Sequence, residues 1–103
     1  MNPFDLLKNA KQIQEQMGMF QEKLAEMSAT GSSGGGMVEI DLNGTFELTA
    51  VRISPEIFSS GDIDMLGDLI IAANANSFEK IKEKIDMEMR TMTGGMNIPG
   101  LAV

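Results

Sequence analysis

Three carboxylates, Glu39, Asp41 and Glu47, are the side chains whose type and spacing could form a metal site or an acid–base site. Carboxylates bind hard cations and can act as general acids or bases. Glu39 and Asp41, however, alternate with apolar neighbours, as polar side chains do on the solvent-facing side of a strand. This pattern favours an exposed strand face. We therefore predict no metal site and no catalytic residue.

The cations of the chain could instead contact phosphate groups. Two lysines lie three residues apart near the start of a predicted helix, and two more lie four apart near the other end of the chain. The alternative is a solvated helix face, and acids interleaved among the C-terminal cations favour ion pairs within that helix. The candidates for phosphate contact are Lys8, Lys11, Lys23, Lys80, Lys84 and Arg90.

The composition argues against an enzyme. The 103 residues include no cysteine and no histidine. Disulfides, thiolate metal sites and thiol catalysis are therefore excluded, and so is the usual general base near neutral pH. We predict a binding protein that needs no cofactor and has no small-molecule substrate.

The net charge of −7 is unevenly spread along the chain. Residues 37–68 carry seven acids and one base, whereas residues 1–36 and 69–103 are nearly neutral. A negatively charged partner would have to meet the two ends. The longest apolar run, residues 69–73, is far shorter than the ~20 residues that span a bilayer. These features predict a soluble, cytoplasmic protein that does not interact with membranes.

A long helix is predicted from Pro3, with Asn2 as its N-cap, to about Met27. Along it, apolar residues recur at alternating gaps of four and three, which is the heptad spacing that keeps one stripe of a helix facing a partner helix. The pattern predicts packing against another helix, either within the chain or between two chains. We call this stripe the seam; its candidate contact residues are Leu6, Ile13, Met17, Phe20 and Leu24.

A glycine- and serine-rich run, residues 30–36, ends the helix. Such runs can cradle phosphate, but a phosphate loop follows a strand and opens a helix. This run follows a helix and precedes a strand, which favours a flexible turn. Residues 28–32 could also lie extended as a short edge strand.

Two strands and a hairpin are predicted next. Val38, Ile40 and Leu42 share one face of the first strand, and Asn43-Gly44 marks the turn. A three-residue loop keeps this face apolar, pairing Leu42 with Phe46, Ile40 with Leu48 and Val38 with Ala50. A change of apolar parity further on predicts a bulge near residues 49–50. Arg52 is expected to neutralise Glu39 or Asp41 across the strands.

A second long helix is predicted after Gly61, with Ser60 or Asp62 as its cap, running to about Met92 and ending at Gly94-Gly95. Its apolar stripe comprises Ile63, Leu66, Ile70, Ala73, Ser77, Ile81 and Ile85, widened by Leu69 and Phe78. The fold class is therefore α+β: a long N-terminal helix, a two- or three-stranded antiparallel sheet and a long C-terminal helix. We expect one domain over residues 1–93 and a flexible tail over 94–103.

Several motifs together resemble the YbaB/EbfC family of bacterial nucleoid-associated proteins. They cover essentially the whole chain in the family's order, although no single motif would suffice. The motifs are Leu6-Leu7-Lys8-x-Ala10-x-x-Ile13-Gln14-x-x-Met17-x-x-Phe20-Gln21-Glu22, Gly35-Gly36-Met37-Val38, Asn43-Gly44, Val51-Arg52-Ile53-Ser54-Pro55-Glu56, Met65-Leu66-x-Asp68-Leu69-Ile70-x-Ala72-Ala73-Asn74 and the Gly94-Gly95-Met96…Pro99-Gly100 tail.

The resemblance implies a tweezer-shaped homodimer that binds duplex DNA and associates with the nucleoid, without enzymatic activity or cofactor. With so few cations, binding should rest on phosphate contacts and show weak sequence preference. One departure is the segment Asn74-Ala75-Asn76-Ser77-Phe78-Glu79-Lys80, where the family usually has an asparagine-aspartate or asparagine-glutamate pair followed by alanine. An alternative hypothesis is a scaffold dimer that binds other proteins through helical surfaces rich in its ten methionines.

Overall fold

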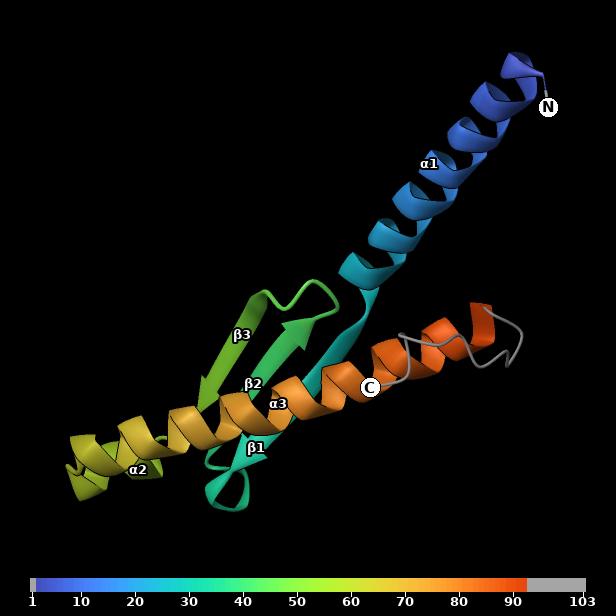
Figure 1. The fold of residues 1–103 in the computed structure, drawn as a ribbon. Coiled ribbons are helices and arrows are strands. Elements are labelled where there is room, and N and C mark those ends of the chain that lie inside the picture. The colour runs from blue at the N-terminus through green and yellow to red at the C-terminus, as the bar shows by residue number, and fades with distance from the viewer. Residues whose placement is uncertain (1, 93–103) are drawn as a thin grey trace.

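The computed structural model describes residues 2–92, which form an elongated molecule of 69 × 23 × 17 Å. A long helix projects from one end of a three-stranded antiparallel sheet, and a second long helix lies across the sheet (Figure 1). The predicted fold class is confirmed, with three strands. The elements are α1 (Pro3–Glu26), β1 (Ser28–Ser33), a 3-10 turn (Gly34–Gly36), β2 (Val38–Asn43), β3 (Leu48–Ile53), α2 (Glu56–Ser60) and α3 (Ile63–Met92).

Both ends of α1 follow the local sequence. The side chain of Asn2 accepts a hydrogen bond from the amide of Phe4 at 3.2 Å, and Pro3 occupies the first turn, where no amide donor is needed. The helix ends at Glu26, and the amide of Met27 donates to the carbonyls of Lys23 and Leu24. The predicted start and end of this helix are confirmed.

The glycine-rich run is only partly a turn. The predicted edge strand is confirmed and extends to Ser33, so the turn is confined to Gly34–Gly36, where all three glycines have positive φ. The prediction of a turn over residues 30–33 was wrong because Gly31 serves close packing. A Cβ at Gly31 would lie 2.1 Å from the amide nitrogen of Ser77 and 2.5 Å from the carbonyl oxygen of Ala73. Gly31 is therefore the point where α3 crosses β1.

The β2–β3 hairpin has a different register from the predicted one. Leu42 pairs with Leu48, and four residues separate the strands instead of three. The side chain of Asn43 closes this longer loop by accepting hydrogen bonds from the amides of Thr45 and Glu47 at 3.0 and 2.9 Å. The remaining pairs of the apolar face are Ile40 with Val51 and Val38 with Ile53.

The predicted bulge is confirmed. Asp41 pairs with Ala50 while the next residue, Leu42, pairs with Leu48, so Thr49 is the extra residue on β3. The hydroxyl of Thr49 donates to the carbonyl of Asp41 at 3.3 Å. This insertion moves Val51 and Ile53 onto the apolar face, which a regular ladder would not do.

The helix α3 begins at Ile63, and the side chain of Asp62 caps it by accepting from the amide of Met65 at 2.9 Å. Its predicted stripe forms the core with the sheet: Ala73, Ser77 and Ile81 are fully buried. The outer members were predicted wrongly, since Ile63 lies beyond the sheet at 81 % exposure and Phe78 is 45 % exposed. The buried apolar residues are Ala29, Val38, Ile40, Leu42, Ile57, Ala73 and Ile81. The expected helix end at Gly94-Gly95 and the tail over 94–103 lie outside the described residues.

Candidate nucleic-acid interface

The helix α1 is an arm attached to the rest of the molecule at its C-terminal end. The amide of Gly44, in the hairpin loop, donates to the carbonyl of Leu24 at 2.8 Å. A Cβ at Gly44 would lie 2.3 Å from that same carbonyl oxygen, so glycine permits the contact. Beyond this joint, α1 and α3 diverge (Figure 1). We call α1 the arm and the sheet with α3 the body.

The seam is largely uncovered along the arm. No residue of α1 is buried, and the seam residues Ile13 and Met17 are 56 % and 59 % exposed. Only at the base do Phe20 and Leu24 become half-buried. There the seam forms one wall of a groove of about 430 Å³, and Met89 of α3 stands on the other side. The helix-against-helix packing expected of the seam is therefore absent along the described part of this single chain.

The cations of the arm lie on the side opposite to the seam. Each helical residue turns by about 100°, so Lys8 and Lys11 point roughly away from the seam and lie next to each other. Glu15, Glu22 and Glu26 share that polar side nearer the sheet by the same geometry. The arm is consequently positive toward its tip and acidic toward its base. The amino end of the helix dipole adds partial positive charge at the tip.

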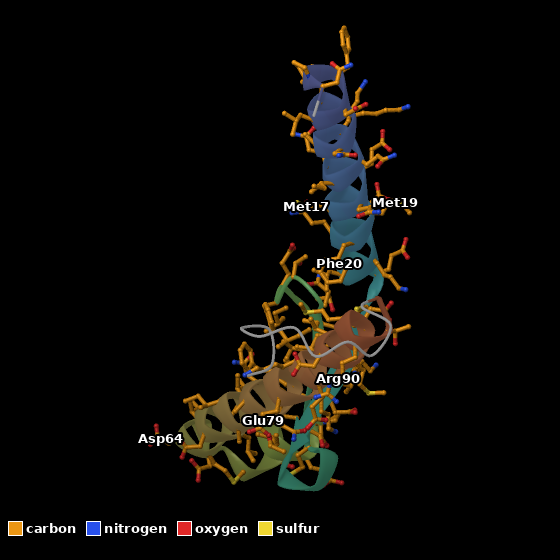
Figure 2. All side chains as sticks on the ribbon, turned by 45° about the vertical axis from the view of Figure 1, so that its right-hand side comes forward. Met17, Met19, Phe20, Asp64, Glu79 and Arg90 are labelled. Carbon is orange, nitrogen blue, oxygen red and sulfur yellow. The ribbon has the colours of Figure 1, made fainter. Side chains whose placement is uncertain are left out.

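The remaining cations are separated from this tip. Lys23 forms an ion pair with Glu88 of α3, and the ammonium of Lys84 donates to the carbonyl of Ser28 at the start of β1. Lys23 therefore ties the base of the arm to α3, and Lys84 ties α3 to the start of β1. Lys80 is exposed on α3, as is Arg90 near its C-terminal end (Figure 2). The six candidates thus fall into a pair near the arm's tip and a group along α3 and the joint.

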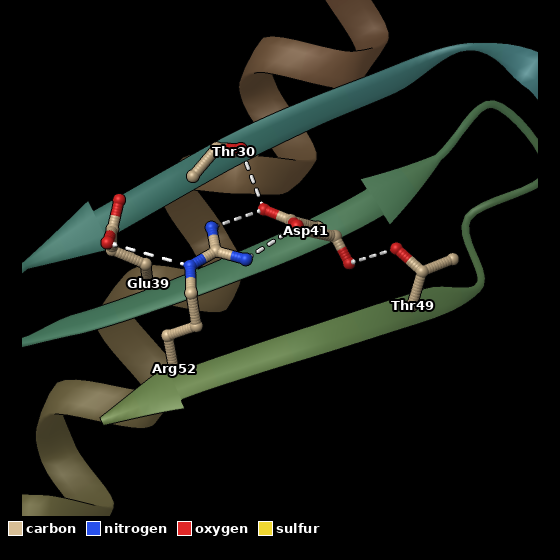
Figure 3. A network of polar contacts seen from close by, with 5 residues as sticks. All are labelled: Thr30, Glu39, Asp41, Thr49 and Arg52. Atoms are coloured by element: carbon tan, nitrogen blue, oxygen red, sulfur yellow. Dashed lines mark hydrogen bonds and ion pairs between the residues drawn. The ribbon is translucent and has the colours of Figure 1, made fainter.

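The open face of the sheet carries a polar network (Figure 3). Arg52 donates two hydrogen bonds to Asp41, both at 2.8 Å, and lies 3.7 Å from a carboxylate oxygen of Glu39. The hydroxyl of Thr30 also donates to Asp41 at 2.7 Å. The bonds from Arg52 and then from Thr30 lower the pKa of Asp41 from its ordinary 3.8 to about 2. The same pairing raises the pKa of Arg52.

This network confirms the expectation that Arg52 neutralises the acids across the strands, and it engages both of them. Glu47 lies apart, in the hairpin loop, where it accepts from the hydroxyl of Thr45 at 3.0 Å. Among residues 2–92, no group of histidine, cysteine or acidic side chains is arranged to hold a metal ion. None of the helices in the described part of the chain is long and apolar enough to cross a membrane.

An aromatic pair was missed at the sequence level. The rings of Phe46 and Phe78 lie 5.0 Å apart with an interplanar angle of 30°. The sequence pattern predicts Phe46 as a strand residue and Phe78 as part of the core stripe. The position of Phe78 at the margin of the α3 stripe is the one sequence feature that indicates partial exposure of its ring.

Comparison with known proteins decides the family. The model of the YbaB/EbfC DNA-binding family matches residues 1–96. The chain belongs to this family. The family resemblance found in the sequence motifs is therefore confirmed, and the family is described as DNA-binding.

Relatives of similar sequence have names that agree with this family. A nucleoid-associated protein of Caldanaerobacter subterraneus is 41 % identical over 97 residues, which cover 94 % of this chain and 87 % of the relative. A nucleoid-associated protein of Gluconacetobacter diazotrophicus is 43 % identical over 94 residues, covering 91 % and 88 %. The crystal structure of an uncharacterized protein of Helicobacter pylori shares the fold, with a TM-score of 0.73 and 22 % identity over 90 % of this chain and 98 % of that one.

Proposed function

We propose that this protein binds duplex DNA as a homodimer, through phosphate contacts made by the lysines of its arms. The observation that carries the proposal is the arm itself, which exposes a seam on one side and Lys8 and Lys11 on the other. Membership of a DNA-binding family supports DNA as the partner. The names of the relatives support association with the nucleoid, where the protein would affect chromosome organisation and gene expression.

The dimer follows from the cost of an uncovered seam. An isolated helix gains little stability from propensity alone, and most helical stability in proteins comes from packing an apolar face. The arm has 24 residues and no buried side chain, and the heptad spacing of its seam suits a helix of a second copy. Pairing through the seam would leave the lysines on the outer side of each arm.

We rank the candidate cations for phosphate contact by the ion pairs and hydrogen bonds that each already makes within the protein. Lys8 and Lys11 make no ion pair with any residue that the structure describes, and they lie at the most positive part of the arm. Lys80 is a second choice because acids are interleaved around it. Lys23 and Lys84 already have partners on α3 and β1, so they would have to exchange a protein contact for a phosphate.

The acidic sheet face must turn away from the duplex. Glu39 and Asp41 carry two negative charges there and Arg52 carries one positive charge, so the face stays net negative and repels phosphate. DNA would therefore be held by the arms. Because phosphates are identical along the duplex, such contacts position the protein without reading sequence.

Charge reversal at the arm's tip tests the proposal. We expect Lys8→Glu combined with Lys11→Glu to abolish measurable duplex binding, equally for unrelated sequences, in a fluorescence anisotropy titration. The control is Lys82→Glu, a charge reversal on α3 at a lysine outside the candidate set, compared with Lys11→Glu alone, which makes the same charge change on the arm. Equal losses in these two single variants, or full binding by the Lys8/Lys11 double variant, would contradict the placement of the site on the arms.

A scaffold dimer that binds proteins is the second candidate, because Met17, Met19 and Met87 are all more than half exposed. Pull-down from a lysate, with and without nuclease treatment, separates the two functions. Partners that disappear with nuclease support DNA binding. Partners that persist, in the absence of direct DNA binding by the purified protein, support the scaffold.

A further inference from the structure

The groove in the angle between the arm and α3 is apolar and open. Its volume is about 430 Å³, which lies within the range of pockets that hold ligands. Six of its lining residues belong to α1, between Ile13 and Leu24, and Met89 belongs to α3. All seven are uncharged, so the groove offers nothing to a phosphate backbone and suits an apolar, uncharged occupant.

The walls of the groove are held in place where the arm joins the body. The amide of Gly44 donates to the carbonyl of Leu24 at 2.8 Å, and Lys23 forms its ion pair with Glu88 of α3. These two contacts set the position of the arm relative to α3, so the groove does not close on itself. The half-buried ring of Phe20 therefore gains further burial only from a segment that enters the groove.

The chain itself has a segment of matching chemistry beside the groove. Residues 93–103 contain no charged side chain, and their apolar members include Met96, Ile98 and Leu101. The groove residue Met89 precedes this segment by only four residues, which is about one helical turn. The segment therefore starts next to the groove that it would fill.

Residues 96–101 are long enough to cover the wall that the arm contributes. From Ile13 to Leu24 a helix rises about 17 Å, and six extended residues span up to about 20 Å. Gly94-Gly95 precede these six residues. Because glycine adopts the backbone conformations that a sharp reversal requires, the chain can turn there from α3 toward the arm.

Two glutamines make the edges of the groove suitable for a peptide backbone. Gln16 and Gln21 both line it, and helical geometry places them about 140° apart, one on each side of the seam. An extended segment has backbone amides and carbonyls that need partners. A glutamine side chain can both donate and accept hydrogen bonds, so the two amides can pair with that backbone while apolar side chains enter between them.

We propose that residues 96–101 of the same chain occupy this groove and brace the arm against α3. Met96, Ile98 and Leu101 would cover the apolar side chains at the base of the seam. The segment would then be docked, in contrast to the flexible tail that the sequence predicts. The inference goes beyond the proposed function because it concerns the base of the arm. The outer part of the seam, toward Leu6, and the lysines near the tip stay available to a second copy and to DNA.

Disulfide formation in the full chain tests the placement, because the chain has no other cysteine. Met17 lines the groove, Met19 points to the opposite side of α1, and both are exposed, so replacing them does not disturb the core (Figure 2). Met17→Cys and Met19→Cys are each combined with Ile98→Cys. Nearly the same length of chain separates the two thiols in each pair, so a free segment would reach either one at similar rates.

We expect the Met17/Ile98 pair to form an internal disulfide at least about tenfold faster than the Met19/Ile98 pair under mild oxidation, because docking raises the local concentration of one thiol at the other. Mass spectrometry and non-reducing electrophoresis separate internal disulfides from covalent dimers. Circular dichroism checks that both proteins fold.

Two charge variants of the Met17/Ile98 protein give a second measurement. Leu101→Asp should slow the internal disulfide to the rate of the Met19/Ile98 control, because it places an unpaired carboxylate in an apolar groove. Asn97→Asp adds the same charge to the same segment at a polar position, and it should leave the rate within about twofold. A preference for Met17 that survives Leu101→Asp would overturn the inference.

The other outcomes separate this inference from the proposed function. Equal disulfide rates for the two pairs overturn the inference alone. Covalent dimers in place of the internal disulfide also overturn it, since the segment then enters the groove of a second copy. A wild-type protein that neither dimerises in sedimentation nor binds DNA overturns the proposed function, while a selective internal disulfide in the Met17/Ile98 protein still supports the docked segment.

Discussion

The two long helices have similar apolar stripes but very different surroundings. The stripe of α3 is buried against β1 and β2, with Ala73, Ser77 and Ile81 inaccessible to solvent. Among residues 2–92, the seam of α1 meets only the hairpin loop and the end of α3, both at its base, and its outer turns have no partner there (Figure 1). An amphipathic pattern therefore indicates that a helix packs, but whether the partner is in the same chain depends on where the chain directs that helix.

The largest expected effect is on the free energy of unfolding, when a glycine of the body and a glycine of the arm are each replaced by alanine. Gly31→Ala should lower the free energy of unfolding by about 3 kcal/mol or prevent folding, because its Cβ would overlap backbone atoms of α3. Gly18→Ala, in the open interior of α1, should instead stabilise the helix by about 1 kcal/mol. Urea denaturation followed by circular dichroism measures both. Equal effects would mean that α3 does not cross β1 so closely.

The next largest effect is on dimerisation, when an acidic residue is placed on one side or the other of the arm. Met17 and Met19 point to opposite sides of α1, and both are exposed in the single chain (Figure 2). Met17→Asp should weaken dimerisation by about a hundredfold or more, because a buried, unpaired carboxylate costs several kcal/mol. Met19→Asp should leave the dimer unchanged. If both variants sediment like the wild type, the seam is not part of the interface.

The smallest effect concerns the polar network of the body. Asp41 has a lowered pKa, so its contribution to stability is complete above about pH 4 and is lost as the pH falls toward about 2. Thermal midpoints measured between pH 5 and pH 2 should fall less steeply in Asp41→Asn than in the wild type. Arg52→Gln, which removes the main hydrogen-bond donor, should behave like Asp41→Asn. Parallel curves for all three proteins would refute the pairing in solution.

Local features of the fold could be predicted from the sequence. Asn2 and Asp62 are caps, the parity change before Val51 marks a bulge, and the isolated Arg52 meets the acids across the strands. Each of these depends on residues close in sequence or directly opposite in a hairpin.

The hairpin register was mispredicted because it depends on a backbone conformation that the sequence does not favour. A phenylalanine at positive φ, with Asn43 closing the loop through its side chain, cannot be read from propensities. Gly31 was misjudged for a related reason, since its role depends on a helix more than 40 residues away in the chain.

For the candidate site, the sequence identifies which residues could contact phosphate but not which protein groups they already bind. The ion pair of Lys23 with Glu88 and the contact of Lys84 with Ser28 depend on how α1 and β1 lie relative to α3. The spacing of the lysines gives their faces on each helix but not these partners. The exposure of Leu48 and Val51 on β3 was likewise not predictable from the sequence, because it results from the width of the sheet relative to the single helix that covers it.

The affinity of the wild-type protein for duplex DNA as a function of salt concentration tests the central claim most directly. If Lys8 and Lys11, with or without one further cation, contact phosphates in each copy, a dimer neutralises about 4–6 phosphates, and a plot of log affinity against log salt should have a slope of about −4 to −5. A slope near zero, or no binding even at low ionic strength, would contradict the account.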